Sequence, residues 1–170
     1  MLLTPRFLRC LIDIKIRKAE LADAAIIAEF NLLLANETEG LRLDPDCVRA
    51  GVMTLLADST KGVYYVAEIE ETIAGQLMIT YEWSDWRNGN IWWIQSVYVR
   101  QEFRQKGVFT ELFHTLEALA RVQKDVCGLR LYMHADNRTA RRSYERLGMH
   151  QTKYEVFELV LDSASAEGLG

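Results

Sequence analysis

Residues 97–109, VYVRQEFRQKGVF, change midway from the residue pattern of a strand to that of a helix. Val97 and Val99 are β-branched and share one face of an apolar alternation with the two-residue period of a strand. From Val108 onward, apolar residues recur at positions 108, 112, 116 and 119, which is the spacing of one helical face. The stretch therefore predicts a strand, a short turn and a helix.

The turn between these two elements combines positive charge with a glycine. Arg104, Gln105, Lys106 and Gly107 stand where the helix begins, and a helix N-terminus offers unpaired backbone N–H groups and the positive end of a dipole. Gly107 has no Cβ, so a ligand can approach the backbone closely. Most such turns only connect two elements, but this one has the properties of a phosphate site. The glycine patterns of Rossmann and P-loop proteins are both missing from the sequence.

Two motifs resemble those of the GNAT superfamily of acyl-CoA-dependent N-acyltransferases. Residues 104–109 are similar to motif A, [QR]-x-x-G-x-[GA] after a strand, in which Arg104 and Gly107 match and Phe109 replaces the usual Gly or Ala. Residues 137–149, NRTARRSYERLGM, match motif B, N-x-x-A-x-x-x-Y-[EK]-[KR]-x-G-[FM], at every informative position. With the surrounding strand and helix patterns, the resemblance covers about residues 14–160.

The resemblance implies an α/β fold in which helices flank a mixed, mainly antiparallel central sheet. It also implies that acetyl-CoA is the acyl donor, with its pyrophosphate on the N–H groups of residues 104–109 and its pantetheine arm paired with residues 97–99 like an extra strand. An N–H on that strand would polarise the thioester carbonyl as negative charge develops there. The residues that the resemblance places at acetyl-CoA are Val97, Tyr98, Val99, Arg104, Gln105, Lys106, Gly107, Val108, Phe109, Asn137 and Tyr144.

Tyr144 is the candidate general acid, because the family places a tyrosine beside the sulfur of CoA. The thiol that forms from the departing thiolate has a pKa of about 8.5, and the tyrosine hydroxyl has a pKa of about 10. The hydroxyl is therefore neutral at pH 7 and can hydrogen-bond to the thiolate and deliver a proton. The alternative is a tyrosine at the edge of the core on an amphipathic helix. Asn137 likewise has two readings, as the N-cap of that helix and as a contact to CoA.

The general base is not evident from the sequence. Many members of the family have a glutamate on the central strand, but this chain has Gln95 and Ser96, and neither is a base at neutral pH. A water molecule held by Glu82 or Glu37 is the substitute that we consider.

Acidic and aromatic residues surround the Asn88-Gly89 turn signal and suggest a seat for a cationic amine. Charge pairing and cation–π contact would both contribute to such a seat. The placement of YEWSDW (residues 81–86) weakly resembles the polyamine acetyltransferase branch. The candidate acceptor residues are Glu37, Glu82, Trp83, Asp85 and Gln95. The alternative is that Trp83, Trp86, Trp92 and Trp93 only pack across strands and that the acids are solvated.

Local signals predict the remaining elements. Asp44-Pro45 is a helix start, Asn137 an N-cap and Gly148 a helix end. We expect strands over 12–17, 62–69, 72–82, 129–133 and 154–161, helices over 21–34 and about 45–57, a loop over 36–40, and a hairpin at Asn88-Gly89 that leads into the strand ending at Val99.

Length and composition indicate one globular domain, residues 12–161, between an N-terminal extension (1–11) and a flexible tail (162–170). The net charge of −4 argues against a nucleic-acid partner, and no apolar run is long enough to span a membrane. Three widely spaced cysteines, Cys10, Cys47 and Cys127, suit reduced thiols in a cytoplasmic protein. The three histidines have no metal-ligand spacing, so we expect no metal.

Three functions remain open from the sequence. The first is an N-acetyltransferase that acts on a primary amine of a small molecule or peptide, as a monomer or as the homodimer common in the family. The second is an acyl-CoA-binding module with weak or no catalysis, suggested by Phe109 and by the missing glutamate. The third is a protein-interaction scaffold built on the tryptophan hairpin, which would not bind CoA.

Overall fold

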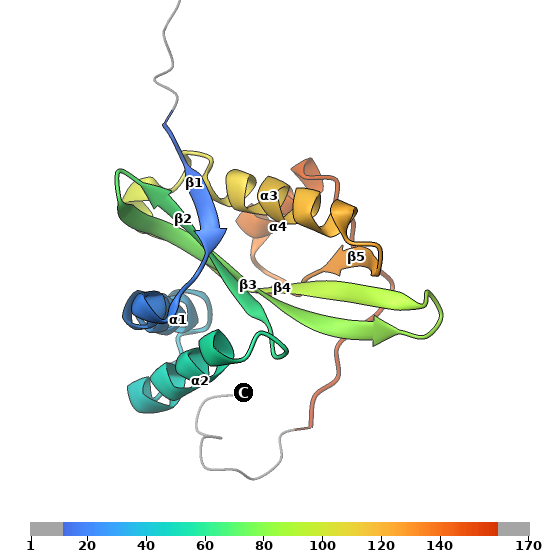
Figure 1. Cartoon of the computed structure of the whole chain (residues 1–170), viewed down its shortest axis with the longest axis horizontal. Coiled ribbons are helices and arrows are strands. Elements are labelled where there is room, and N and C mark those ends of the chain that lie inside the picture. The colour runs from blue at the N-terminus through green and yellow to red at the C-terminus, as the bar shows by residue number, and fades with distance from the viewer. Residues whose placement is uncertain (1–11, 160–170) are drawn as a thin grey trace, which may run out of the picture.

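A five-stranded sheet separates two pairs of helices in this chain, of which the computed structural model describes residues 12–159 (Figure 1). The helices α3 and α4 lie on one side of the sheet, and α1 and α2 lie on the other. The elements in chain order are β1 (Lys15–Lys18), a 3-10 turn (Leu21–Asp23), α1 (Ala24–Glu39), α2 (Pro45–Ala57), β2 (Val63–Ile69), β3 (Thr72–Ser84), β4 (Gly89–Val99), a second 3-10 turn (Gln101–Phe103), α3 (Val108–Val122), β5 (Val126–Arg130) and α4 (Arg138–Arg146). The predicted α/β class with a mixed, mainly antiparallel sheet is confirmed.

The strands lie in the order β1-β2-β3-β4-β5, and only the last pair, β4 and β5, is parallel. Two tight turns produce the antiparallel meander. Glu70 and Glu71 take positive φ values of 49° and 62° between β2 and β3, and Asn88 takes 49° before Gly89. Both turns lie where the sequence predicts them: Glu70 and Glu71 fall between the two expected strands, and Asn88-Gly89 readily adopts the backbone of a tight turn.

Each face of the sheet has its own apolar core. Toward α3, the fully buried residues Leu77 and Ile79 of β3 pack with Leu112 and Leu116 of the helix. Toward α1 and α2, Ile27 and Val52 pack with Val66 of β2. Because helices cover both faces, the central residues of β3 and most of β4 are buried or half-buried.

The predicted helix caps are confirmed. The Asp44 side chain accepts a hydrogen bond from the N–H of Asp46 (3.0 Å) with Pro45 in the first turn. Asn137 accepts from the N–H of Ala140 (3.0 Å), and Gly148 follows α4 with a φ of 83°. These signals depend only on neighbouring residues, which is why they can be read from the sequence.

The predicted loop at residues 36–40 is wrong, because α1 continues to Glu39. The Thr38 hydroxyl donates to the carbonyl of Leu34 (2.8 Å), and the helix ends only at Gly40, whose φ is 69°. The polar residues 36–39 form the last helical turn, and the N–H of Gly40 closes it by donating to the Asn36 carbonyl (3.1 Å). Glu37 is consequently a helix residue in a defined position.

Three strand predictions need correction. β1 spans residues 15–18 instead of 12–17, and β5 spans 126–130 instead of 129–133. Residues 154–159 form no strand, and Val156 and Phe157 are largely exposed there; residues 160–161 lie outside the described part, as do 1–11 and 162–170. A strand needs a neighbour to pair its backbone, and alternation in the sequence does not supply one.

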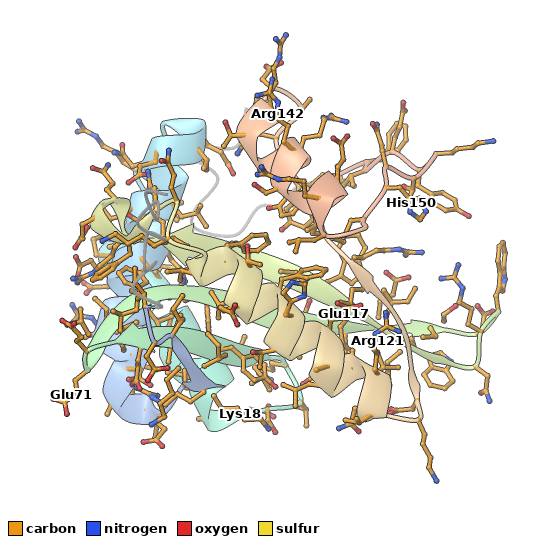
Figure 2. All side chains as sticks on the ribbon, turned by 90° about the horizontal axis from the view of Figure 1, so that it is seen from above. Lys18, Glu71, Glu117, Arg121, Arg142 and His150 are labelled. Atoms are coloured by element: carbon orange, nitrogen blue, oxygen red, sulfur yellow. The ribbon has the colours of Figure 1, made fainter. Side chains whose placement is uncertain are left out.

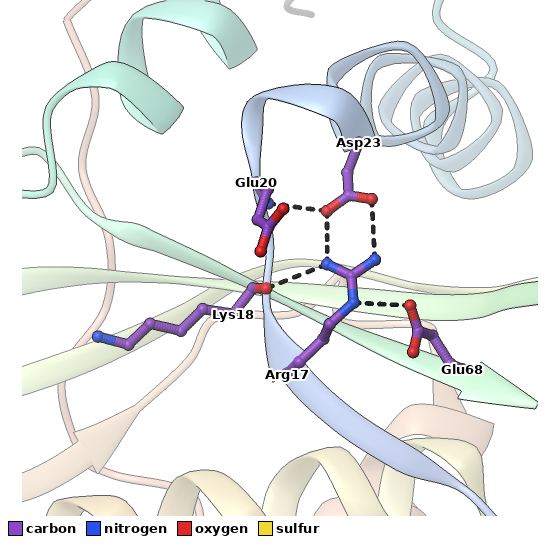
Figure 3. A network of polar contacts seen from close by, with 5 residues as sticks. All are labelled: Arg17, Lys18, Glu20, Asp23 and Glu68. Atoms are coloured by element: carbon purple, nitrogen blue, oxygen red, sulfur yellow. Dashed lines mark hydrogen bonds and ion pairs between the residues drawn. The ribbon is translucent and has the colours of Figure 1, made fainter. Parts of the chain in front are cut away.

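Charged residues cover the outer helical faces. In Figure 2, Arg121 lies beside Glu117 on α3, one turn away, and Arg142 points outward from α4. In contrast, an ionic cluster lies between β1, β2 and the start of α1 (Figure 3). Arg17 donates both terminal nitrogens to Asp23 (2.7 and 3.0 Å) and its Nε to Glu68 (2.6 Å), and the N–H of Glu20 donates to Asp23 (2.7 Å). The hydrogen bonds from Arg17, opposed by burial, lower the pKa of Asp23.

The substitution Asp23→Asn is expected to destabilise the domain by about 2 to 4 kcal/mol, because it leaves the Arg17 guanidinium without its bidentate partner in a largely buried site. Since the folded pKa of Asp23 is lowered, its stabilisation is complete above the unfolded pKa of about 3.9 and is lost as the pH falls through the folded value. Urea unfolding of wild type and variant at pH 7 and at pH 3 measures both effects. A difference between the two proteins that is the same at both pH values would contradict the ionic account.

Candidate active site

The edge of β4 becomes unpaired halfway along the strand. β5 pairs with β4 only over residues 90–93, and the ladder ends at Trp93 opposite Arg130. Beyond Trp93, the described chain has no strand on this side of β4. Tyr132, which follows β5, contacts β4 only through side chains: its ring lies 6.0 Å from that of Trp93, and its hydroxyl lies 3.5 Å from Gln95 Oε1. The N–H and C=O groups on this edge of residues 95–99 are available to an extended ligand, except the Val99 carbonyl, which accepts from Arg104.

A β-bulge interrupts β4 at the start of this edge. Gln76 faces Tyr98 and Met78 faces Gln95, so Ser96 and Val97 both stand opposite Leu77. Ser96 has a φ of 49°, which is unusual for a residue other than glycine. The extra residue displaces local backbone groups from the ladder with β3 and redirects the strand.

The basic turn lies directly after β4 and leads into α3. Gly107 precedes the helix in a left-handed conformation (φ 90°) and Gln105 also has a positive φ of 62°. Gln105, Lys106 and Gly107 are exposed, whereas Val108 is buried in the core below α3. The helix start is thereby anchored to the core, a few residues after the end of β4.

Arg104 is held by residues of α1 and β4. Its Nε donates to the Val99 carbonyl (2.9 Å) and a terminal nitrogen donates to Glu37 (2.5 Å), which also accepts from the Tyr98 hydroxyl (3.0 Å). Burial opposes ionisation of Glu37, but the hydrogen bonds from Arg104 and Tyr98 prevail and lower its pKa. Glu37 is therefore an ionised partner of the basic turn at neutral pH.

Tyr144 lies on α4 and contacts the start of α3. Its ring meets that of Phe109 edge to face, with centroids 5.6 Å apart, and Phe109 also contacts Phe113 at 6.2 Å. Burial raises the pKa of Tyr144 above its ordinary value of about 10, so the hydroxyl is neutral at pH 7. Phe109, which departs from motif A, supplies the surface on which Tyr144 packs.

The tip of the β3–β4 hairpin forms a cavity of about 260 Å³. Its lining residues are Glu82, Trp83, Ser84, Asp85, Trp86, Arg87, Arg130 and Tyr154. Glu82 accepts two hydrogen bonds from Arg130 (2.9 and 3.1 Å) and one from the Trp93 indole. Trp86 is 88% exposed and Trp83 59%, whereas Trp92 is buried, so two of the four tryptophans belong to the surface.

The structure brings together only part of the predicted acceptor set. Glu82, Trp83 and Asp85 share the hairpin cavity, but Glu37 lies with Tyr98, and Gln95 donates to Thr80 (2.6 Å) midway along β4. Glu82 pairs with Ile91, and Tyr98 is seven residues further on β4, or about 23 Å at 3.3 Å per residue. A single seat made of all these acids does not exist in the described chain.

The comparisons with known proteins agree with this architecture. Residues 42–149 match the model of the Acetyltransferase (GNAT) family. The chain belongs to the GNAT family. A comparison with curated proteins found no match.

The similarity to solved structures covers more of the chain than residues 42–149. A possible acetyltransferase from Clostridium difficile 630 is 44% identical, with a TM-score of 0.83 over 88% of this chain and 99% of that one. A predicted acetyltransferase from Clostridium acetobutylicum, solved with acetyl-CoA, is 19% identical with a TM-score of 0.71 over 87% and 96% of the two chains. The aminoglycoside N-acetyltransferase AAC(6')-Iy in complex with CoA is 16% identical (TM-score 0.70, 93% and 99%) and shares the fold. The family model and the 44% identical structure support an acetyltransferase, and the two less similar structures show the shared fold.

The two glutamates considered as partners of a catalytic water are already engaged in this GNAT enzyme. Neither Glu37 nor Glu82 is an unpaired carboxylate, since each already accepts from an arginine and from one other side chain. Across residues 12–159, no helix has the length and apolar character to cross a bilayer, and no three potential metal ligands gather. The sequence did not point to Tyr132, Thr80 or the partners of Glu82, because these contacts join separate strands.

Proposed function

We propose that the protein transfers the acetyl group of acetyl-CoA to a primary amine by direct attack within a ternary complex. The observation that supports this most is the unpaired edge of β4, which runs from the bulge at Ser96 to the anchored basic turn. An extended pantetheine arm would pair with Val97, Tyr98 and Val99, and the pyrophosphate would lie on the N–H groups of residues 104–109. Asn137 caps α4, and the resemblance to motif B makes it a further candidate contact to CoA.

The chemistry requires one bond exchange and two proton movements. The neutral amine nitrogen attacks the thioester carbonyl carbon, and the carbon–sulfur bond breaks as the tetrahedral intermediate collapses. A backbone N–H of residues 97–99 stabilises the oxyanion, and Tyr144 donates its proton to the departing thiolate. The nitrogen releases its extra proton to water, because Glu37 and Glu82 are engaged by arginines. The products are an N-acetylamine and CoA.

The hairpin cavity restricts the class of amine that we propose as the acceptor. Asp85 lines it beside the exposed Trp83 and Trp86, but Arg87 and Arg130 are also there, so the local charge is balanced. The cavity lies well away from the bulge along β4, so it would hold a distant part of an extended amine and not the reacting nitrogen. This geometry favours a long polyamine or a peptide over a compact amine.

Thiol release from acetyl-CoA across a panel of amines tests the proposed function. The panel should include long polyamines, peptides with a free α-amine, and compact amines. Turnover with any primary amine supports an acetyltransferase. Binding of acetyl-CoA without turnover would indicate the acyl-CoA-binding module, and no binding would indicate an interaction scaffold. We propose a cytoplasmic location, in agreement with the free thiols Cys47 and Cys127.

The substitution Asp85→Asn is expected to raise KM for the amine by up to about tenfold while KM for acetyl-CoA stays constant, since an exposed carboxylate contributes about 1 kcal/mol to binding a cation. Glu82→Gln should have the same direction but also loosen its contacts to Arg130 and Trp93. Asp58→Asn, on the exposed turn between α2 and β2 and outside the cavity lining, is the matched control. If KM for the amine is unchanged in both variants, or if the enzyme prefers neutral amines, the cavity does not bind a cationic acceptor. The hairpin tryptophans would then serve only in packing.

A further inference from the structure

Two side-chain amides, the half-buried Asn31 and the buried Gln76, connect α1 to the bulge of β4. The Gln76 side chain on β3 is completely buried, and its Nε2 donates to Asn31 Oδ1 on α1 (2.8 Å) and to the Ser96 carbonyl (3.3 Å). Asn31 in turn donates to the hydroxyl of Tyr64 on β2 (2.9 Å). Burial raises the pKa of Tyr64, and hydrogen bonds from Asn31 and Ser96 partly offset this rise. The Gln76 amide thereby joins Asn31 of α1 to the backbone of Ser96.

This arrangement is costly for a core that only has to be packed. Gln76 Oε1 is buried without a hydrogen-bond partner among the described residues. An unsatisfied buried acceptor costs about 1 to 3 kcal/mol, and a non-glycine residue at the φ of 49° found at Ser96 costs a similar amount. An apolar side chain in place of Gln76 would avoid the first cost. Such strain is found where the surrounding structure must hold one particular backbone conformation.

The conformation held here is that of the bulge. Because Ser96 and Val97 share one partner on β3, the backbone after Ser96 turns its N–H groups out of the regular ladder. The same residues begin the β4 edge, which has no β5 neighbour beyond Trp93. The direction of these N–H groups depends on the peptide unit of Ser96, and the amide of Gln76 binds the oxygen of that unit.

We propose that Gln76, supported by Asn31, is a positioning residue that fixes the bulge so that a backbone N–H of Val97–Val99 is aimed at the thioester carbonyl. This inference rests on the proposed function. It assigns a role in transition-state stabilisation to a residue that does not contact acetyl-CoA. A misdirected donor binds the ground state almost as well but loses stabilisation of the developing oxyanion.

Gln76→Met tests the role, because methionine has a similar shape and cannot donate to Ser96. We expect kcat to fall by about ten- to a hundredfold, somewhat less than the loss of a whole oxyanion donor, and the Kd of CoA to change less than about twofold. The carbonyl stretch of bound acetyl-CoA, labelled with carbon-13, should move toward its frequency in water. Asn31→Ala, on the half-buried face of α1, should shift both readouts in the same direction if Gln76→Met does not fold.

Ser96→Gly provides the rescue. Glycine adopts a positive φ without strain, so the bulge can persist without its clamp, and Gln76→Met/Ser96→Gly should recover most of the lost kcat. Ile27→Ala, in the same core and equally buried, is the control for lost stability and should keep wild-type kcat. Wild-type kcat and carbonyl frequency in both Gln76→Met and Asn31→Ala, or no rescue by Ser96→Gly, would overturn the positioning role alone. Absence of turnover in the wild type would overturn the proposed function and this inference with it.

Discussion

Replacement of Tyr144 with phenylalanine is expected to lower kcat by about ten- to a thousandfold and to leave the affinity for acetyl-CoA nearly unchanged. A general acid acts as the carbon–sulfur bond breaks, and the expected loss of kcat overlaps the rate contribution that is typical of such a group. Phenylalanine keeps the edge-to-face contact with Phe109, so α4 should remain in place. The measurement is steady-state kinetics together with calorimetric titration of acetyl-CoA.

The pH dependence gives an independent check on Tyr144. Burial raises its pKa above about 10, so the acid form is present throughout the neutral range. The wild-type kcat should therefore fall only at strongly alkaline pH, as the hydroxyl ionises, and this alkaline limb should be missing from Tyr144→Phe. Tyr65→Phe is the matched control, because burial raises that pKa as well but the residue lies in the core between β2 and α3. An unchanged kcat in Tyr144→Phe would remove the acid role.

Replacement of Gly107 with valine is expected to weaken acetyl-CoA binding by at least about tenfold. Gly107 has a φ of 90°, and a β-branched residue strongly resists such a conformation, so the start of α3 should shift. A Cβ at this position would meet no protein atom within 4 Å, so the free protein has no clash to explain the loss. The effect would come from the displaced N–H groups and from the bulk placed against the pyrophosphate.

Two further variants separate these causes. Gly107→Ala adds the positive-φ penalty with little bulk and should weaken binding less than valine. Gly40→Val is the matched control, because Gly40 ends α1 with a φ of 69° and also has open space around a Cβ. It should lower the melting temperature without a comparable loss of acetyl-CoA affinity. Calorimetry that shows wild-type affinity in Gly107→Val would place the pyrophosphate elsewhere.

The features predictable from the sequence are those decided by a few neighbouring residues. Asp44 and Asn137 cap helices through bonds to residues two or three positions away, and the Asn88-Gly89 turn needs only its own backbone. The strand–turn–helix unit of residues 97–109 also forms where its pattern predicts it. Local hydrogen bonding and steric preference are sufficient for such elements.

The predictions that failed depended on a partner far away in the chain. Alternation in residues 154–161 indicated a strand, but residues 154–159 have no adjacent strand to complete their hydrogen bonds. The end of α1 was read as a loop because its residues are polar, yet Glu37 there binds Arg104 and Tyr98, more than sixty positions away. Propensity indicates what a segment can form, and pairing across the sheet decides whether it does.

The family, the helix caps at Asp44, Asn137 and Gly148, and the motif residues expected at acetyl-CoA could be read from the sequence alone, because each depends on local order along the chain. How these residues meet depends on the tertiary structure. In the folded chain, Glu37 lies at the Tyr98 end of β4 and Glu82 lies opposite Ile91 near its other end, and each binds an arginine. The ring of Tyr144 packs on Phe109. The fold also places the buried amide of Gln76 under the bulge at Ser96. These contacts join different strands and helices, so they exist only once both apolar cores have formed.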